Sequence, residues 1–410
     1  MGGRYGQTWL ASLPVSRTVT LVLVDEVGAP LGVLPPFAVD IPYWPEVAGV
    51  VAAARERFGV EVAVLRMLSA ERPIPHGGAV TYLAQATGIP DVYAGPVEVD
   101  LSDHPHRADY ARPGGPTESL RWAALALEVG GRGPVTEAIQ QRTWNLSAIW
   151  RLETPSASVW LKHVPHFFDH EPTVLRWIAE NVAESGEDQP VPRVLGSLGG
   201  RMLLDHVVGD DLYDAGPEIR DAIAADMHGI QVVAADHTAD LLGAGVPDRR
   251  PTNLTADIAR VVTEHGGADA RLDALVTGID DRLAKVASCG LPDTLVHGDL
   301  HPGNVRSDGR SRTLIDWGDS FVGHPAFDIL RLTEELDEPD ANHLIDTWAA
   351  RWRAAAPGCD PYLAVELMRP VAALRNAAVY AHFLDNIEPA EHPYHAADVG
   401  FWLTRAAEFA

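Results

Sequence analysis

Cysteine and long apolar runs are the first things that this sequence lacks. Two cysteines, Cys289 and Cys359, occur among 410 residues; they are too few for a disulfide framework and fit a reducing compartment. No apolar run approaches the roughly 20 residues that a bilayer-crossing helix requires. The first residues also lack the basic segment and apolar stretch of a secretory signal. We therefore expect a soluble, cytoplasmic protein without a membrane partner.

Positive charge is scarce too. The chain has 32 basic and 57 acidic residues, for a net charge of −25. This excess of acid argues against nucleic acids and anionic membranes as partners, because both bind basic surfaces, and it favours cationic small molecules. Lysine occurs only as Lys162 and Lys285. Lys162 lies inside the apolar segment 158–164, so its presence there requires a reason.

The rest of the composition is that of an ordinary globular protein, 46% hydrophobic and long enough for two or three domains. We predict a small α+β accessory domain over 1–115, a linker helix within 116–134, a β-rich unit over 135–207 and a helical unit over 208–410. Apolar periodicity and turn residues predict the elements. The strands cover 18–24, 60–68, 79–86, 146–152, 158–164, 193–195 and 201–206, and the helices cover 46–58, 117–128, 168–182, 217–242, 268–288, 341–354, 361–384 and 397–409.

A non-helical island, residues 294–328, carries the clearest chemistry. It reads Leu-Val-His-Gly-Asp-Leu-His-Pro-Gly-Asn from 295 to 304 and Leu-Ile-Asp-Trp-Gly-Asp from 314 to 319. Asp299 and Asn304 have the D-x-x-x-x-N spacing of a kinase catalytic loop. Asp316 follows an apolar strand and precedes a glycine turn, a place where a carboxylate can be held rigidly against a metal ion.

Phosphoryl transfer explains these residue types, because it requires positioning and neutralisation of phosphate charge. Magnesium prefers oxygen ligands, which Asp316 and the side-chain carbonyl of Asn304 supply. Asp299 would orient the acceptor hydroxyl and accept its proton. Lys162 would hold the α- and β-phosphates, positioned by Glu171, which lies on the apolar face of a helix and therefore points inward.

The His-Gly-Asp-Leu-His-Pro-Gly-Asn and Ile-Asp-Trp-Gly segments resemble those of the aminoglycoside phosphotransferase family, whose relatives include choline kinases and protein kinases. The resemblance covers about residues 135–410. It implies a bilobal, protein-kinase-like α+β fold, with a small β-rich N-lobe and a large helical C-lobe, and MgATP as phosphate donor. It makes Asp299 the base, Asn304 and Asp316 metal ligands, and His297 a structural anchor of the loop. Asp328 matches the aspartate that braces this loop in such kinases.

The same resemblance locates the remainder of the nucleotide site. The loop that covers the phosphates falls near residues 142–148, which contain no glycine. Backbone donors or Ser147 would then contact the phosphates. Asp205–Val207 falls at the hinge between the lobes, where backbone groups would meet the adenine edge.

The acceptor is expected to be a small molecule with a hydroxyl group. Residues 331–410 hold 13 acidic and 6 basic side chains, including Glu334, Glu335, Asp337 and Glu338. An acidic cleft would suit an aminoglycoside-like or amino-sugar acceptor. Trp348, Trp352, Tyr380 and Trp402 are candidates either for stacking on sugar rings or for core packing.

Several alternatives remain open at this point. The enzyme can be a maltokinase-like sugar kinase or a choline- or homoserine-kinase-like enzyme, and the chain can also be a nucleotide-binding pseudokinase. His297-x-Asp299-x-His301 can also be read as zinc ligands of a hydrolase. The sequence does not fix the oligomeric state.

The accessory domain has a weak resemblance of its own. The strand–helix–strand around residues 46–60 resembles a Nudix hydrolase domain, but only Glu56 is retained, and Ala53 and Arg57 stand where that family has metal-binding glutamates. We therefore expect a non-catalytic domain that serves acceptor recognition or dimer contacts.

Overall fold

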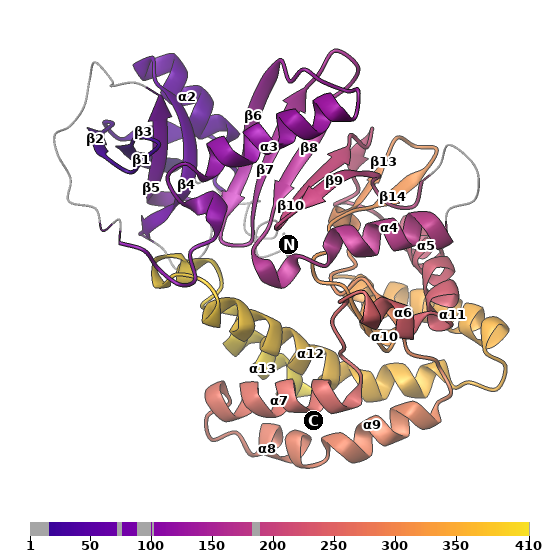
Figure 1. Ribbon diagram of the computed structural model, residues 1–410. Coiled ribbons are helices and arrows are strands. Elements are labelled where there is room, and N and C mark those ends of the chain that lie inside the picture. Colours follow the sequence, from indigo (N-terminus) through magenta and orange to yellow (C-terminus); the bar gives the residue numbers. More distant parts are fainter. Residues whose placement is uncertain (1–15, 72–75, 88–99, 101, 183–188, 410) are drawn as a thin grey trace.

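The computed structural model describes residues 16–71, 76–87, 100, 102–182 and 189–409, and it is a mixed α+β structure (Figure 1). The N-terminal residues that bear on a secretory signal lie outside these ranges. No helix within them combines the length and the apolarity that crossing a bilayer requires.

The first sheet is formed by residues 17–87. Its strand order is β2-β1-β5-β4, with β3 also paired to β1; β1 runs parallel to β5, and the other pairs are antiparallel. Helix α2 (Ala48–Phe58) packs on the sheet and ends at Gly59, whose φ of 65° is left-handed, a conformation that glycine adopts without strain. The strands are β1 (Arg17–Val24), β2 (Pro30–Val33), β3 (Phe37–Val39), β4 (Glu61–Ala70) and β5 (Gly78–Thr87).

The second sheet is antiparallel and has the order β6-β7-β8-β10-β9. Helix α3 (Gly115–Val129) lies on it, with Ala123 and Leu127 in a common core with Leu152 and Leu161. Helix α4 (Glu171–Asn181) follows β8 and joins the core of the helical part. The strands are β6 (Glu137–Trp144), β7 (Ser147–Glu153), β8 (Val159–His163), β9 (Val194–Leu198) and β10 (Arg201–Asp205).

The helical part begins after β11 (Asp210–Asp211). Its helices are α5 (Pro217–Ala235), α6 (Thr238–Gly243), α7 (Pro251–His265), α8 (Ala270–Thr277), α9 (Ile279–Ser288), α10 (Ala326–Thr333), α11 (Glu338–Ala355), α12 (Pro361–Asp385) and α13 (Asp398–Glu408). Between α9 and α10 lie the short strands β12 (Thr294–Val296), β13 (Val305–Ser307), β14 (Arg312–Leu314) and β15 (Phe321–Gly323), which form two small sheets with β11. These small sheets support the motif segments.

The first sheet is not packed independently of the rest. One core joins Trp44 of the N-terminal region to Trp144 at the end of β6, Phe168 before α4, Phe383 of α12 and Tyr394. Figure 1 shows the chain after α12 reaching the lower end of the first sheet, next to β4. The first sheet and its neighbouring segments therefore contact both the second sheet and the C-terminal segment.

Most predicted strands and helices are confirmed to within a few residues, but three differences stand out. The helices predicted over 217–242 and 268–288 are each two helices, separated near His237 and at Gly278. Several elements were not predicted, among them β2, β3, β6, α7 and α10, the last of which begins within the segment 294–328 that was expected to be non-helical. For α7 the signal was present, because its buried residues Leu254, Ile258, Val261 and Val262 have helical spacing.

Candidate active site

The predicted catalytic loop connects β12 to β13 and contains one 3-10 turn, Pro302–Asn304. The turn brings Asn304 back to Asp299. The Asn304 Nδ2 group donates to the main-chain oxygen of Asp299 at 3.0 Å and lies 3.3 Å from its Oδ2 atom. The acid and the amide therefore converge, as their spacing predicts.

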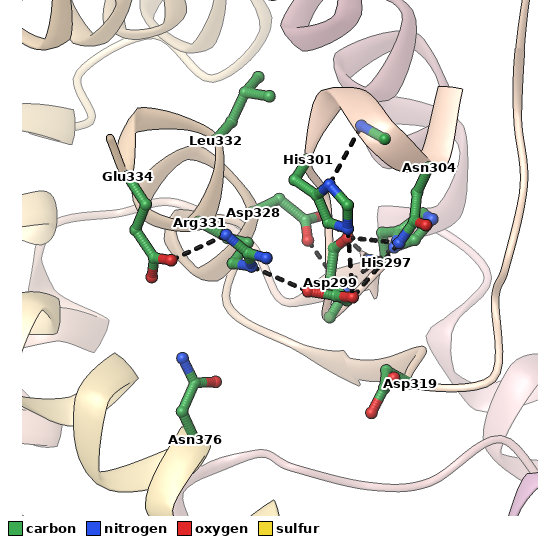
Figure 2. A network of polar contacts seen from close by, with 12 residues as sticks. His297, Asp299, His301, Asn304, Asp319, Asp328, Arg331, Leu332, Glu334 and Asn376 are labelled. Atoms are coloured by element: carbon green, nitrogen blue, oxygen red, sulfur yellow. Dashed lines mark hydrogen bonds and ion pairs between the residues drawn. The ribbon is translucent and has the colours of Figure 1, made fainter. Parts of the chain in front are cut away.

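The Asp299 carboxylate is the centre of a polar network (Figure 2). Arg331, on α10, donates from Nε to Oδ1 at 2.8 Å and also binds Glu334, while His301 Nε2 lies 3.6 Å from Oδ2. Burial alone would raise the pKa of Asp299, but the Arg331 guanidinium and His301 hold it well below its usual range. Asp299 is therefore ionised at neutral pH and held at both oxygens.

His297 and Asp328 hold the backbone of the catalytic loop. Asp328 accepts the backbone N–H groups of His297 and Gly298, both at 3.0 Å, and the side chain of Gln231 at 2.9 Å. His297 is fully buried, contacts the carbonyl of Ile315 through Nε2 at 3.0 Å, and packs against the Trp317 ring at an interplanar angle of 47°. These contacts orient the backbone that carries Asp299.

Asp316 follows β14 in an unusual conformation. Its φ of 63° is left-handed, which is uncommon for a residue other than glycine and is concentrated at functional sites. Lys162 of β8 donates from Nζ to Asp316 Oδ1 at 2.6 Å and to Glu171 at 2.7–2.8 Å. Burial opposes the ionised form of Asp316, but Lys162 holds its pKa well below the usual range. Lys162 thus joins the second sheet to the motif segment.

Glu171 occupies the first turn of α4, with Pro172 in the position where a helix tolerates proline. Its side chain is 1% exposed. Besides Lys162, it accepts the backbone N–H of Trp317 at 3.2 Å. Burial raises the pKa of Glu171, and the ammonium of Lys162 opposes that rise.

A cavity of about 280 Å³ lies between the second sheet and the motif segments. Six of the predicted residues line it: Lys162, Glu171, Asp205, Val207, Asn304 and Asp316. Its other walls include Trp160 and Leu204 from the sheet, Tyr213, and the pair Glu46 and Arg142. Such a mixture of aromatic, aliphatic and paired charged groups suits a nucleotide better than a purely apolar ligand.

Ser147 is not brought to this cavity. It pairs with Trp144 across the turn of the β6–β7 hairpin, and its hydroxyl accepts from Trp144 Nε1 at 3.1 Å. The hairpin instead lines the cavity with Gln141, Arg142 and Ile149. A bulge between Gln140 and Arg142 shifts the register of β6 and so decides which side chains face inward.

A second cavity, of about 310 Å³, adjoins the catalytic loop at Gly298. Three of the four predicted acidic residues, Glu334, Glu335 and Glu338, line it, together with Gly298 and Arg331. Asp337 does not line it and instead caps α11 by accepting the N–H of Asp340. Arg369, Arg375 and Arg405 also line this cavity, so its wall carries both signs of charge.

The aromatic candidates pack in or against the core, and one of them also lines this second cavity. Trp348 and Trp352 are buried in the helical core, and Tyr380 packs against that core and Phe383. Trp402 lines the cavity with Phe409. Trp402 also packs against the helical core, so core packing accounts for all four residues and only Trp402 lines the cavity as well.

Three residues of the site, Arg331, Arg142 and Glu46, were not predicted from the sequence. Arg331 follows Asp328 by three positions on α10, so it lies on the same helix face, and that spacing was the available signal. Arg142 is the first residue of the glycine-free segment 142–148, but only Ser147 and the backbone of that segment were expected to contact phosphates. Glu46 comes from a region far earlier in the chain, and nothing local to it indicated the cavity.

The zinc interpretation of His297, Asp299 and His301 finds no support in the geometry. His297 contacts the Ile315 carbonyl, and His301 Nδ1 receives the N–H of Gly303 at 3.1 Å. Among the described residues, no three His, Cys, Asp or Glu side chains are grouped to hold a metal ion.

Comparisons with known proteins agree with the motif assignment. A family model described as the phosphotransferase enzyme family, APH, matches residues 139–362. A search of curated proteins gives no significant match.

Solved structures of similar fold include choline kinase LicA from Streptococcus pneumoniae, with a TM-score of 0.51, 13% identity, and coverage of 70% of this chain and 98% of that one. Macrolide 2'-phosphotransferase type I gives a TM-score of 0.50 and 18% identity, with coverage of 70% and 97%. A thermostable mutant of the aminoglycoside phosphotransferase APH(4)-Ia, in a ternary complex with ADP and hygromycin B, gives 0.46 and 16%, with coverage of 70% and 96%. The first two share the fold of this chain.

Proposed function

The chain belongs to the phosphotransferase enzyme family, and from that premise we propose that it transfers the γ-phosphoryl group of ATP to a hydroxyl group of a small cationic molecule, an aminoglycoside-like compound or an amino sugar. The supporting observation is that Lys162 lies within 2.6–2.8 Å of both Glu171 and Asp316, beside the cavity that Asn304 also lines. The second sheet and the helical part then form the two lobes of a kinase, and residues 1–115 form an accessory domain.

Each residue has a distinct task in this proposal. Lys162, held by Glu171, binds the α- and β-phosphates, and the backbone of Asp205–Val207 meets the adenine. Asp299 orients the acceptor hydroxyl and takes its proton as the oxygen attacks the γ-phosphorus, while the bond from that phosphorus to the bridging oxygen breaks and ADP leaves. His297 and Asp328 hold the backbone of the loop and touch neither substrate.

The donor set around Asn304 and Asp316 fits Mg²⁺. Asn304 uses its amide nitrogen on Asp299, so its carbonyl oxygen can face a cation, and Asp316 is kept ionised by Lys162. Both supply the hard oxygen atoms that magnesium prefers. When bound, the ion would neutralise charge on the phosphate oxygens. The cytoplasm is the place that we propose for this reaction, since it supplies ATP and keeps the two free cysteines reduced.

The second cavity supports the choice of acceptor. It adjoins the catalytic loop at Gly298, its volume falls in the ordinary range for small-molecule sites, roughly 300–1,000 Å³, and carboxylates line it. Glu338 is exposed and Glu334 is paired with Arg331. An ammonium group of the acceptor would meet these carboxylates, while Trp402 offers a face to a sugar ring.

A panel assay tests this function. The purified full chain would be incubated with MgATP and, separately, with aminoglycosides, amino sugars, choline, ethanolamine, homoserine and maltose, and phosphomonoester formation would be followed by ³¹P NMR. We expect transfer to an aminoglycoside or amino sugar. Transfer only to maltose or to an amino alcohol would assign a metabolic kinase, and ATP binding without any transfer would assign a pseudokinase.

A further inference from the structure

The segment Tyr43–Glu46, which joins β3 to α2, lies along β6 at the nucleotide cavity. The Thr143 N–H donates to the Pro45 carbonyl at 3.0 Å, and the Val47 N–H donates to the Gln141 carbonyl at 3.0 Å. Glu46 and Arg142 face each other as an isolated antiparallel bridge. The N-terminal region therefore adds an extended segment beside β6, the strand that contributes Gln141 and Arg142 to the cavity wall.

A buried arginine fixes this segment in place. Arg17 of β1 is fully buried and donates to the carbonyls of Tyr43, Trp44 and Glu46 at 2.6, 3.0 and 2.7 Å. The Tyr82 hydroxyl also donates to the Trp44 carbonyl, at 2.8 Å. Because three carbonyls are held by one rigid guanidinium, the backbone of the segment has a single position relative to the first sheet.

Gln140 locks the other side of the contact. Its side-chain amide accepts from the N–H of Val64 and donates to the carbonyl of the same residue, both at 2.8 Å. The bulge after Gln140 then turns Arg142 to the cavity rather than to the first sheet. Contacts from the N-terminal region therefore fix the position of β6, which forms part of the cavity wall.

Arg142 carries its charge into the cavity and is held by a carboxylate. Its Nε donates to Glu46 Oε1 at 2.9 Å, and one Nη2 hydrogen goes to the same oxygen. Within the described part of the chain, Nη1 has no hydrogen-bond partner, and the side chain is 30% exposed. Burial would lower the pKa of Arg142, but the carboxylate of Glu46 raises it. Arg142 and Asp316 both line the cavity.

Three cationic side chains line the cavity. Lys162 is held by Glu171 and Arg142 by Glu46. The third, Arg306, is bound to Asp211. We propose that Arg142 contacts the β- and γ-phosphate oxygens of the nucleotide in place of a glycine-rich loop, and that Glu46 is the residue that positions it. The N-terminal domain thereby completes the nucleotide site. This inference rests on the proposed function, since it requires that the cavity bind a nucleoside triphosphate.

The test compares nucleotides that differ in the number of phosphates. MgATP, AMP and adenosine would each be titrated into the full chain by calorimetry. Arg142→Gln should weaken MgATP binding by about 10- to 100-fold, because it removes a charge-assisted hydrogen bond, and it should leave AMP and adenosine binding unchanged. Arg142→Lys should recover part of the loss, since the charge remains and the fork geometry does not.

Glu46→Gln should raise the KM for ATP by about 3- to 10-fold with little change in kcat, because Arg142 keeps its charge but loses its anchor. Glu61→Gln is the matched control. It removes the acid of another ion pair of the N-terminal region, Arg55–Glu61 at 2.6 Å, which is about half exposed, and it changes the net charge equally. We expect Glu61→Gln to leave all three affinities unchanged.

Three results would overturn the inference. If Arg142→Gln leaves the ratio of MgATP to AMP affinity unchanged, Arg142 does not contact the terminal phosphates, although the proposed function still stands. If Glu46→Gln and Glu61→Gln change the KM for ATP equally, Glu46 does not position Arg142. A wild-type chain that binds no ATP would overturn both this inference and the proposed function.

Discussion

Replacing Lys162 by methionine separates the structural role of the buried lysine from its role in nucleotide binding. Methionine keeps the length and the apolar stem but removes the ammonium that contacts Glu171 and Asp316. Asp316 is 37% exposed and can be solvated, whereas Glu171 is 1% exposed and keeps only the Trp317 N–H, at 3.2 Å. The loss of stability is therefore dominated by Glu171.

The magnitude follows from the protonation of that carboxyl group. A carboxylate that is buried without its cation binds a proton, because the neutral acid does not carry the desolvation penalty of an unpaired buried charge. At pH 7 this protonation costs about 3.7 kcal/mol for a group whose pKa in the unfolded chain is about 4.3. This agrees with the roughly 3–5 kcal/mol for breaking a buried ion pair. In the Lys162→Met variant the pKa of Glu171 in the folded state is raised above its value in the unfolded state. The free energy of unfolding of this variant is therefore closest to that of wild type at low pH, and it falls as the pH rises. At pH 5 the same cost is only about 1 kcal/mol.

Urea unfolding followed by tryptophan fluorescence, at pH 5 and pH 7, measures this difference. The double variant Lys162→Met/Glu171→Leu is the control: it should recover stability to within about 1 kcal/mol of wild type, yet still bind ATP as weakly as the single variant. A single variant that loses the same stability at both pH values would refute the reasoning. So would a double variant that remains as unstable as the single one.

Three further predictions concern the catalytic loop. Arg331→Gln removes the guanidinium that holds down the pKa of Asp299, so the acidic limb of the kcat–pH profile should move to higher pH; an unmoved limb would contradict this role. In Gly303→Ala the new Cβ would lie 2.3 Å from the ring of Tyr213, so ATP affinity should fall, and Tyr213→Ala in the same chain should restore part of it; wild-type affinity in the single variant would show that the ring is free to move. Asp328→Ala leaves one buried and one partly buried backbone N–H group of the loop without their acceptor, so thermal unfolding should show a loss of about 2 kcal/mol with a fall in kcat, whereas an unchanged melting temperature would exclude the bracing role.

The part of the site that the sequence predicts well is the part fixed by local spacing. Asp299 and Asn304 converge because a single 3-10 turn separates them, and Glu171 points inward because the helix begins at that residue. Lys162 was recognisable because a charge inside an apolar strand needs a partner. In each case a few neighbouring residues determine the geometry.

The rest depends on contacts between distant segments. The bulge in β6, which turns Arg142 toward the cavity, cannot be recognised from the hydrophobic pattern of the neighbouring residues. Ser147 lies at the turn of the same hairpin, bound to Trp144. The Glu46–Arg142 pair joins residues 96 positions apart. The left-handed backbone of Asp316 is similarly imposed by its surroundings, since the sequence places no glycine there. Such features follow from tertiary packing, which overrides local preference.

The central claim is that Asp299 acts as the base of a phosphotransfer site whose nucleotide is held by other residues. Turnover and MgATP affinity of Asp299→Asn, measured side by side on the full chain with an accepted substrate, test it directly. We predict that kcat falls by about 10²- to 10⁴-fold while MgATP affinity stays within about threefold of wild type, because Lys162, Asn304 and Asp316 remain. Retained turnover would contradict the assignment of the base. A loss of ATP affinity equal to the loss of turnover would contradict the separation of the two roles.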